Sequence, residues 1–175
     1  NLPSTGRISL SYFSDHRGRI LTEMSIMKHS NQHFTLITAA AAQWHDYELL
    51  LRSIDPNSDI TLEDKSQEVG TLIVTGPKSR DLFNKIVDAD LYLPWLSHQK
   101  AFINKVPVVM ARVSFAGELG WEVHVQNKYL NSIYDQILSL GAKPFGMFAL
   151  NSLRIEKGYR TCLLYTSDAA DDAGS

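Results

Sequence analysis

Several features that mark specialised protein classes are scarce or missing in this sequence. Its 175 residues contain one cysteine, Cys162, so the chain cannot form an internal disulfide framework. No apolar run approaches the roughly 18 residues that a membrane-spanning helix needs. The formal net charge of −2, from 17 basic and 19 acidic side chains, provides no electrostatic footprint for nucleic acid. We therefore expect neither a membrane protein nor a nucleic-acid-binding protein.

Motifs of the common cofactor and metal classes are also missing. No glycine-rich phosphate loop and no nucleophile elbow is present. The six histidines are scattered along the chain, and we expect no metal site. What remains is an ordinary globular composition, with 44% hydrophobic, 21% charged and 10% aromatic residues, enough for one domain or one domain and a piece of another.

The last fourteen residues, 162–175, differ from the rest of the chain. They have no periodicity and no apolar face, and they resemble a translated sequencing adapter, so we expect a non-native tail. A natural acidic tail is the alternative. Without this segment, which carries three aspartates and no basic residue, the net charge becomes +1 and no cysteine remains. Because the chain starts at Asn1 rather than methionine, we also expect both ends to be cut.

Apolar periodicity predicts a series of strands. Residues alternate between polar and apolar over 7–12, which is typical of a half-buried strand, and a second strand is predicted over 19–28. The turn between them, at 15–18, contains Gly18, which can adopt positive φ. Further strands are predicted over 34–38, 69–75, 106–115 and 121–125, and the last two form a glycine-bounded hairpin.

Helices are predicted over 39–52, after Gly76-Pro77, over 127–141 and over 144–158. Helical spacing places one set of residues on the buried face of the first helix: Trp44, Tyr47 and Leu51. It places another set on the buried face of the last helix: Phe145, Phe148, Ala149 and Leu153. Because hairpins rather than strand–helix–strand units connect the strands, we predict an α+β fold with antiparallel sheets and packed helices.

Three motifs carry the functional argument. Residues 17–26 read Arg-Gly-Arg-Ile-Leu-Thr-Glu-Met-Ser-Ile, and residues 112–123 read Arg-Val-Ser-Phe-Ala-Gly-Glu-Leu-Gly-Trp-Glu-Val. Residues 145–160 read Phe-Gly-Met-Phe-Ala-Leu-Asn-Ser-Leu-Arg-Ile-Glu-Lys-Gly-Tyr-Arg. Together with the Gly-Pro-Lys-Ser-Arg turn at 76–80, they resemble the aminomethyltransferase family, the T-proteins of glycine cleavage. The second motif matches the family pattern Ser-aromatic-x-Gly-Glu-x-Gly-x-Glu.

Two departures from the T-protein pattern are similar to the C-terminal domain of FAD-dependent dimethylglycine and sarcosine dehydrogenases. Glu23 stands where T-proteins carry a functional aspartate. The third motif reads Ala-Leu-Asn-Ser-Leu-Arg where T-proteins more often read Ala-Arg-Asp-Ser-Leu-Arg, so Leu150 replaces an arginine that supports folate in the family.

The resemblance implies an incomplete T-protein-like cloverleaf around a folate channel. Residues 1–68 would then be part of one folate-domain sub-domain and residues 69–161 most of the adjoining one. The remaining sub-domain and any FAD-binding half would lie outside this chain.

The resemblance also implies the site. Glu122, with Val123 and His124 beside it, would bind the pterin, because two carboxylate oxygens match the adjacent ring N–H and exocyclic amine of that ring. Phe115 would stack on the pterin. Glu23 would bind the cofactor and act catalytically by stabilising a cation or moving a proton, with Met24 and Ser25 also along the folate. By residue type alone, Glu122 and Glu23 also suit a solvated surface, and Phe115 suits a core.

The implied function is tetrahydrofolate-binding one-carbon transfer, within an N-methyl amine dehydrogenase that forms 5,10-methylenetetrahydrofolate. Its partners would be folate, a secondary or tertiary N-methyl amine, and an FAD-binding half in the same parent chain, and this fragment alone would be inactive. A stand-alone aminomethyltransferase, a folate-dependent demethylase and a non-enzymatic regulatory or folate-binding protein are the alternatives. The expected compartment is the cytoplasm, or the mitochondrial matrix in a eukaryote.

Overall fold

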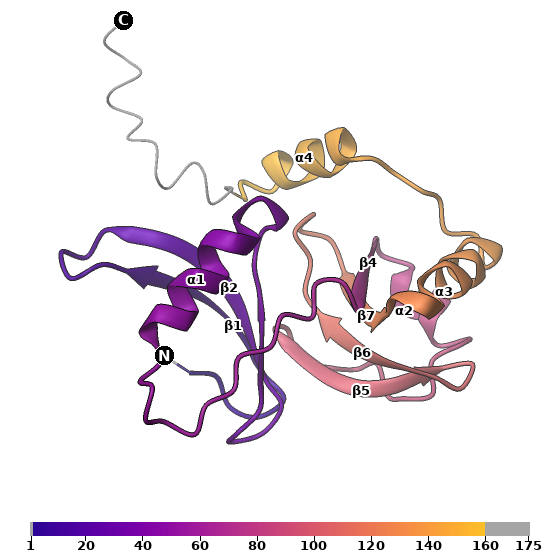
Figure 1. Ribbon diagram of the computed structural model, residues 1–175. Coiled ribbons are helices and arrows are strands. Elements are labelled where there is room, and N and C mark those ends of the chain that lie inside the picture. The colour runs from indigo at the N-terminus through magenta and orange to yellow at the C-terminus, as the bar shows by residue number, and fades with distance from the viewer. Residues whose placement is uncertain (1, 160–175) are drawn as a thin grey trace, which may run out of the picture. The chain divides into compact units, whose positions relative to one another are not determined.

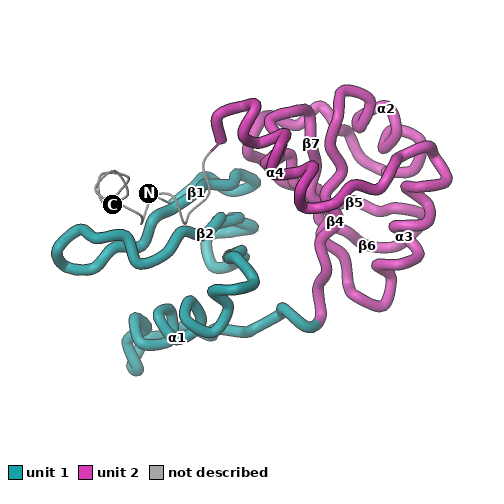
Figure 2. Tube along the Cα trace, turned by 90° about the horizontal axis from the view of Figure 1, so that it is seen from above, with its two compact units in different colours: residues 1–67 teal, residues 68–175 magenta. Residues whose placement is uncertain are grey.

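The computed structural model describes residues 2–159, so the expected non-native tail at 162–175 lies outside the described residues. The chain divides into two compact units, Asn1–Gln67 and Glu68–Ser175 (Figure 2). That these units are sub-domains of a folate domain stays a prediction. Both sheets are antiparallel and helices accompany them, so the α+β class is confirmed.

Unit 1 contains a three-stranded sheet with β2 at its centre (Figure 1). Its elements are β1 (Ile8–Ser14), β2 (Ile20–Lys28), β3 (Phe34–Ile37), the 3-10 helix η1 (Ala40–Ala42) and α1 (Gln43–Ser53). The expected turn joins β1 to β2, with Gly18 at a φ of 79°. Asp15 holds this turn by accepting the backbone N–H groups of Arg17 and Arg19. These bonds, with the Arg19 guanidinium, lower the pKa of Asp15.

The expected inner face of α1 is wrong. Trp44 is 72% exposed and Leu51 is also exposed, whereas Asp46 is the buried residue of the helix. Asp46 accepts a hydrogen bond from the Thr38 hydroxyl and contacts the His45 ring at 2.9 Å. Residues two apart on a helix lie about 200° around its axis. Turning Asp46 toward these partners therefore turns Trp44 away from the interior.

Unit 2 contains a four-stranded sheet of order β4-β7-β6-β5. Its strands are β4 (Val69–Thr75), β5 (Ser97–Ile103), β6 (Val106–Arg112) and β7 (Gly120–Gln126), and its helices are α2 (Ser79–Phe83), α3 (Asn127–Ser139) and α4 (Met147–Glu156). The predicted hairpin of β6 and β7 is confirmed, although β6 ends at Arg112 rather than at residue 115. The helix after Gly76-Pro77 is only one short turn.

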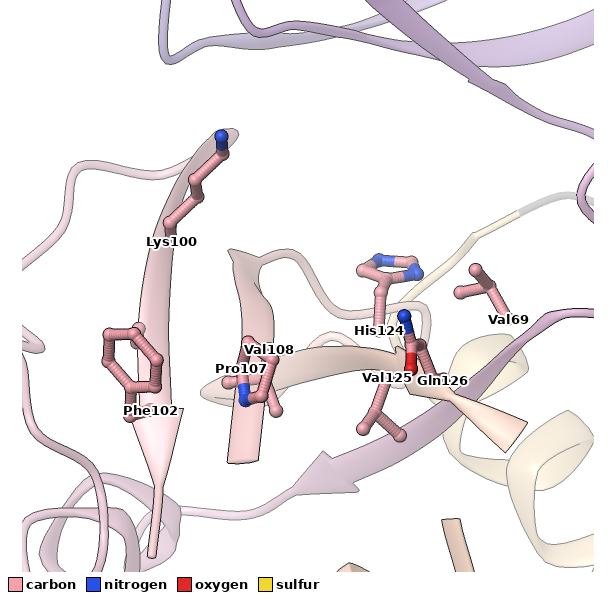
Figure 3. Close-up of a pocket in the computed structure, with 9 residues that line it drawn as sticks. Val69, Lys100, Phe102, Pro107, Val108, His124, Val125 and Gln126 are labelled. Carbon is pink, nitrogen blue, oxygen red and sulfur yellow. The ribbon is translucent and has the colours of Figure 1, made fainter. Parts of the chain in front are cut away.

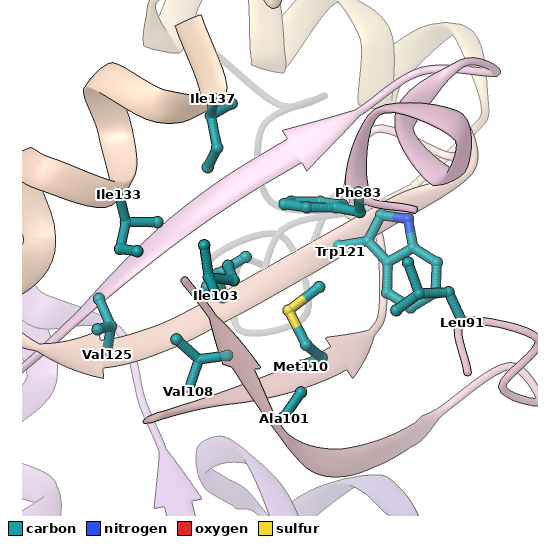
Figure 4. Packing of buried hydrophobic residues seen from close by; sticks show 11 residues of the cluster. Phe83, Leu91, Ala101, Ile103, Val108, Met110, Trp121, Val125, Ile133 and Ile137 are labelled. Atoms are coloured by element: carbon teal, nitrogen blue, oxygen red, sulfur yellow. The ribbon is translucent and has the colours of Figure 1, made fainter. Parts of the chain in front are cut away.

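The core of unit 2 lies on one face of this sheet. Ile133 and Ile137 of α3 point toward the strands, and Phe83 packs edge-on against Trp121 with ring centroids 6.2 Å apart (Figure 4). From the strands the buried cluster takes Ala101, Ile103, Val108, Met110, Trp121, Val123 and Val125. Side chains alternate between the faces of a strand. The intervening residues therefore lie on the other face, which we call the outer face.

Strand β5 was not predicted. It begins Ser-His-Gln-Lys, a polar run without clear alternation, and it lies at the edge of the sheet. Asn104 and Lys105 join it to β6 at φ values of 47° and 69°, the left-handed geometry that suits a two-residue hairpin turn. β5 is therefore held by its pairing with β6, which local sequence does not encode.

The expected inner face of α4 is also wrong. Phe148 is 95% exposed and Phe145, which precedes the helix, is also exposed, whereas Leu150 and Arg154, one turn apart, are the buried residues. Arg154 donates to the Asn151 side chain at 2.9 Å and to the Tyr159 carbonyl at 2.8 Å. Satisfying this buried guanidinium fixes the rotation of the helix, and Phe148 therefore faces outward. No helix within the described part of the chain is long and apolar enough to span a membrane.

Candidate functional site

Glu122 and His124 lie together on the outer face of the second sheet. They alternate along β7 with Trp121, Val123 and Val125, whose side chains fill the core. Across the strands, Glu122 is opposite Ile73 of β4 and Ala111 of β6. Both neighbours are apolar, and the Glu122 side chain is 25% exposed. The carboxylate therefore lies in a partly desolvated position on a rigid central strand.

His124 links Glu122 to a residue distant in sequence. Its Nδ1 lies 2.9 Å from the Thr71 hydroxyl, and Thr71 is its cross-strand partner on β4. Its Nε2 lies 3.3 Å from Oε2 of Glu122. The two atoms are close but not aligned for a hydrogen bond, and among the described residues Nε2 is buried without a hydrogen-bond partner. Thr71 was not identified from sequence, because only strand pairing brings it to His124.

Val123 is fully buried in the core cluster. Its side chain therefore lies on the face opposite Glu122 and His124, and it does not reach the outer face. A binding role for Val123 stays a prediction, and the structure supports no side-chain contact for it with a ligand on the outer face.

The loop between β6 and β7 is fixed by close approaches at its glycines. Gly117 has a φ of 73°, and a Cβ there would lie 2.2 Å from Cγ of Lys157. A Cβ on Gly120 would lie 2.6 Å from Cβ of Ser114. Glu118 forms an ion pair with Lys157 at 3.0 Å, which raises the pKa of Lys157. The glycine spacing of the second motif thus serves packing immediately before Glu122.

The turn at residues 76–80 is tied to the same loop. The carbonyl of Leu119 accepts the backbone N–H of Gly76 at 2.7 Å and the hydroxyls of Ser79 and Thr75 at 3.3 and 3.4 Å. Two motifs that stand apart in sequence therefore meet at one backbone group, which positions the start of β7.

Phe115 is exposed and lies beside Arg154 of α4. The guanidinium carbon of Arg154 lies 5.8 Å from the centroid of its ring, a cation–π arrangement. Phe115 is therefore not a core aromatic, and one partner of its ring is a cation of its own chain. Stacking of Phe115 on a pterin stays a prediction.

Glu23, Met24 and Ser25 lie on β2, the central strand of unit 1. Met24 is buried, and Ser25 is half-buried between Leu10 of β1 and Ile37 of β3. Glu23 is opposite Tyr12, and its Oε2 is buried with no hydrogen-bond partner among the described residues. Glu23 and Glu122 belong to different units.

A pocket of about 260 Å³ adjoins His124 on unit 2 (Figure 3). Its lining is mostly apolar, and it comprises Val69, Lys100, Ala101, Phe102, Pro107, Val108, His124, Val125 and Gln126. Lys100 and His124 lie on strands on either side of β6, both opposite Val109. Glu122 does not line this pocket. His124 lines it and also contacts Glu122, so the pocket is next to the Glu122 position.

The histidines are less scattered than expected. His29 and His33, four residues apart at the β2–β3 turn, stack with ring centroids 4.7 Å apart, and His29 Nε2 lies 2.8 Å from the Thr35 hydroxyl. The part of the chain that the structure describes contains no group of three or more His, Cys, Asp or Glu side chains placed to hold a metal ion.

Comparison with known proteins gives consistent matches. The family model described as the GCVT N-terminal domain matches residues 2–173. Human mitochondrial dimethylglycine dehydrogenase is 29% identical over 167 residues, covering 91% of this chain and 19% of that protein. Mouse mitochondrial sarcosine dehydrogenase is 35% identical over 137 residues, covering 73% and 15%. An aminomethyltransferase of Thermoanaerobacter is 27% identical, covering 87% and 43%.

Solved structures show the same fold. The glycine cleavage aminomethyltransferase T of Bartonella henselae superimposes with a TM-score of 0.76 at 21% identity, covering 91% of this chain and 43% of that one. Heterotetrameric sarcosine oxidase from Corynebacterium superimposes with a TM-score of 0.59 at 15% identity, covering 82% and 69%. The chain thus spans about a fifth of the matched dehydrogenases and less than half of the matched aminomethyltransferases.

Proposed function

This chain belongs to the GCVT N-terminal domain family, and from that premise we propose that it is a tetrahydrofolate-binding one-carbon transfer domain. We further propose that this domain is part of an FAD-dependent dehydrogenase of an N-methyl amine, such as dimethylglycine or sarcosine. Support comes from the dehydrogenases among its relatives, one of them 35% identical, and from Glu23 and Leu150, which depart from the aminomethyltransferase pattern.

The position of the Glu122 carboxylate is the main support for this proposal. A carboxylate on a central strand, flanked by apolar Ile73 and Ala111, needs compensation for its desolvation. Among the described residues, its one recorded ion-pair contact is His124, through Oε2. A ligand with two parallel N–H donors suits this position, because charge-assisted paired bonds are strong and geometrically specific. The residues present therefore fit a pterin.

Bound tetrahydrofolate supplies the nucleophilic amines that capture a one-carbon unit. The chain's own work is to hold and orient that ligand, and Glu122 does so by accepting its paired N–H groups. Glu23 offers a buried carboxylate oxygen that has no hydrogen-bond partner in the part of the chain that the structure describes. Such an oxygen is suited to stabilising a nearby cation or to holding a proton.

In the parent protein, an FAD-binding half would oxidise the amine, and the product would be 5,10-methylenetetrahydrofolate. This assignment rests on the relatives, of which the chain spans about a fifth. If the source is eukaryotic, the compartment would be mitochondrial, as the names of these relatives state. Spectroscopic detection of bound flavin in the full-length protein distinguishes the dehydrogenase from a stand-alone aminomethyltransferase, the second candidate that the sequence matches favour.

The direct test is tetrahydrofolate binding by the full-length protein, measured by titration calorimetry. Glu122→Gln keeps the shape of the side chain and removes its charge. Hydrogen bonds to charged groups contribute about 1.5–3 kcal/mol, so the dissociation constant should rise by roughly tenfold to a hundredfold. Glu156→Gln is the matched control, because Glu156 is exposed and contacts Ser152 on its own helix. Equal affinities for the two variants would reject the role of Glu122.

A further inference from the structure

The protonation pattern around His124 follows from its two partners. A carboxylate only accepts hydrogen bonds, whereas a threonine hydroxyl donates or accepts. Nε2 lies 3.3 Å from Oε2 of Glu122, and a ring that carries a proton on Nε2 avoids two opposed lone pairs there. With its proton on Nε2 alone, the ring accepts at Nδ1 from the Thr71 hydroxyl, 2.9 Å away. In the series Thr71, His124, Glu122, each donor is then directed toward the carboxylate, and the second link is a close approach rather than a hydrogen bond.

The series Thr71, His124, Glu122 is carried by two paired strands. β4 and β7 are paired along their whole lengths, from Val69 opposite Gln126 to Thr75 opposite Gly120. Thr71 and His124 are directly opposite each other, and Glu122 follows on the same face of β7. The His124 side chain is only 11% exposed, so its ring has little freedom to turn away. A side chain on a paired central strand is held more precisely than one on a loop.

The contact between His124 and Glu122 is close to a hydrogen bond in geometry but does not form one. At 3.3 Å it is longer than the roughly 2.7–2.9 Å of a charge-assisted bond, and within residues 2–159 the buried Nε2 has no aligned acceptor. Leaving a buried donor without a partner is unfavourable, so a movement that supplies an acceptor is favoured. Site contacts are often long without ligand and shorten when it binds. A small turn of the carboxylate toward Nε2 would satisfy this donor.

We propose that Thr71 and His124 are positioning residues for Glu122, which set the plane of its carboxylate so that both oxygens meet the paired donors of the ligand. This inference rests on the proposed function. His124 then acts through Glu122 rather than by contacting the pterin. His124→Gln, which places an amide N–H near the position of Nε2, should preserve the effect, whereas His124→Phe keeps a flat ring and removes both nitrogens.

The experiment measures tetrahydrofolate affinity of the full-length protein in a double-mutant cycle. We expect about tenfold weaker binding for His124→Phe, about threefold for Thr71→Val, and less than threefold for His124→Gln. In the Glu122→Ala background, His124→Phe should add no further loss. Thr35→Val is the matched control, since it breaks a threonine–histidine contact of 2.8 Å elsewhere in the chain, and it should bind normally.

A second readout separates positioning from simple support of the fold. The wild type should bind an analogue lacking the exocyclic 2-amino group more weakly than it binds tetrahydrofolate. The His124→Phe variant should bind the analogue and tetrahydrofolate with the same affinity. Retained discrimination in His124→Phe, equal effects of the Phe and Gln variants, or an undiminished loss in the Glu122→Ala background would each overturn the inference. If the wild type binds no tetrahydrofolate, the proposed function fails. If it binds and Glu122→Ala leaves that binding unchanged, the role of Glu122 fails, and this inference fails with it.

Discussion

Gly120→Ala is the perturbation for which the structure sets the clearest expectation. Gly120 opens β7, two residues before Glu122, and it pairs with Thr75 of β4. An alanine Cβ there would lie 2.6 Å from Cβ of Ser114, 2.7 Å from its Oγ and 3.1 Å from the carbonyl of Val113. Non-bonded carbon atoms prefer about 3.5–4.0 Å, so something must move by about an ångström.

The surroundings leave little room for that movement. Ser114 is buried at 6% exposure, and its hydroxyl lies 3.4 Å from that of Thr75. Overpacking of this kind costs about 1–3 kcal/mol. Removing a glycine from a strand returns roughly 0.5–1 kcal/mol, because the unfolded chain loses freedom. We therefore expect a net loss of about 1 kcal/mol, and at most about 2.5 kcal/mol, in the free energy of unfolding.

Urea unfolding of the 175-residue chain, followed by tryptophan fluorescence, measures this loss. Trp121 is fully buried next to the substitution, whereas Trp44 and Trp95 are exposed, so Trp121 dominates the signal change. Ser114→Gly removes the atom that clashes. If the reasoning is right, Gly120→Ala costs clearly less in that background, a coupling of about 0.5 kcal/mol or more between neighbouring sites. Unchanged stability of Gly120→Ala, or strict additivity with Ser114→Gly, would refute it.

Two further predictions test α4 and the loop that contacts it. Leu150→Ala should lower the free energy of unfolding by about 2–4 kcal/mol, whereas Phe148→Ala should change it by less than about 0.5 kcal/mol, because Leu150 is buried and Phe148 exposed; the opposite order in urea melts would mean that the helix faces the other way. Glu118→Gln removes the carboxylate charge that, through its hydrogen bond and its attraction, raises the pKa of Lys157 above its ordinary value of 10.5. When the pKa of a lysine is raised in the folded state, the ion pair stabilises the protein fully at any pH below the unfolded-state pKa. This stabilisation is lost as the pH rises through the folded-state pKa. The stability difference between wild type and Glu118→Gln should thus be present at pH 7–9 and shrink above about pH 10.5, and a difference that grows with pH would contradict it.

Local sequence was sufficient where one chemical rule dominates. Alternation identified β1 and β2, and a continuous apolar run identified β4, because burial of one or both faces of a strand leaves a direct trace in the order of residues. Gly18 marked its turn, since few other residues tolerate its φ of 79°. The second motif placed Glu122 and His124 on one face of a strand, which strand geometry alone implies.

The sequence by itself therefore determined the antiparallel α+β class, the strand that carries Glu122 and the family to which the chain belongs. Tertiary structure alone decided three matters: the edge strand β5, the outward face of Phe148 and the meeting of Thr71 with His124. Each depends on a partner distant in sequence or on the needs of a buried polar group. The free energy of each arrangement depends on contacts that form only when the chain folds, so the local sequence does not contain it.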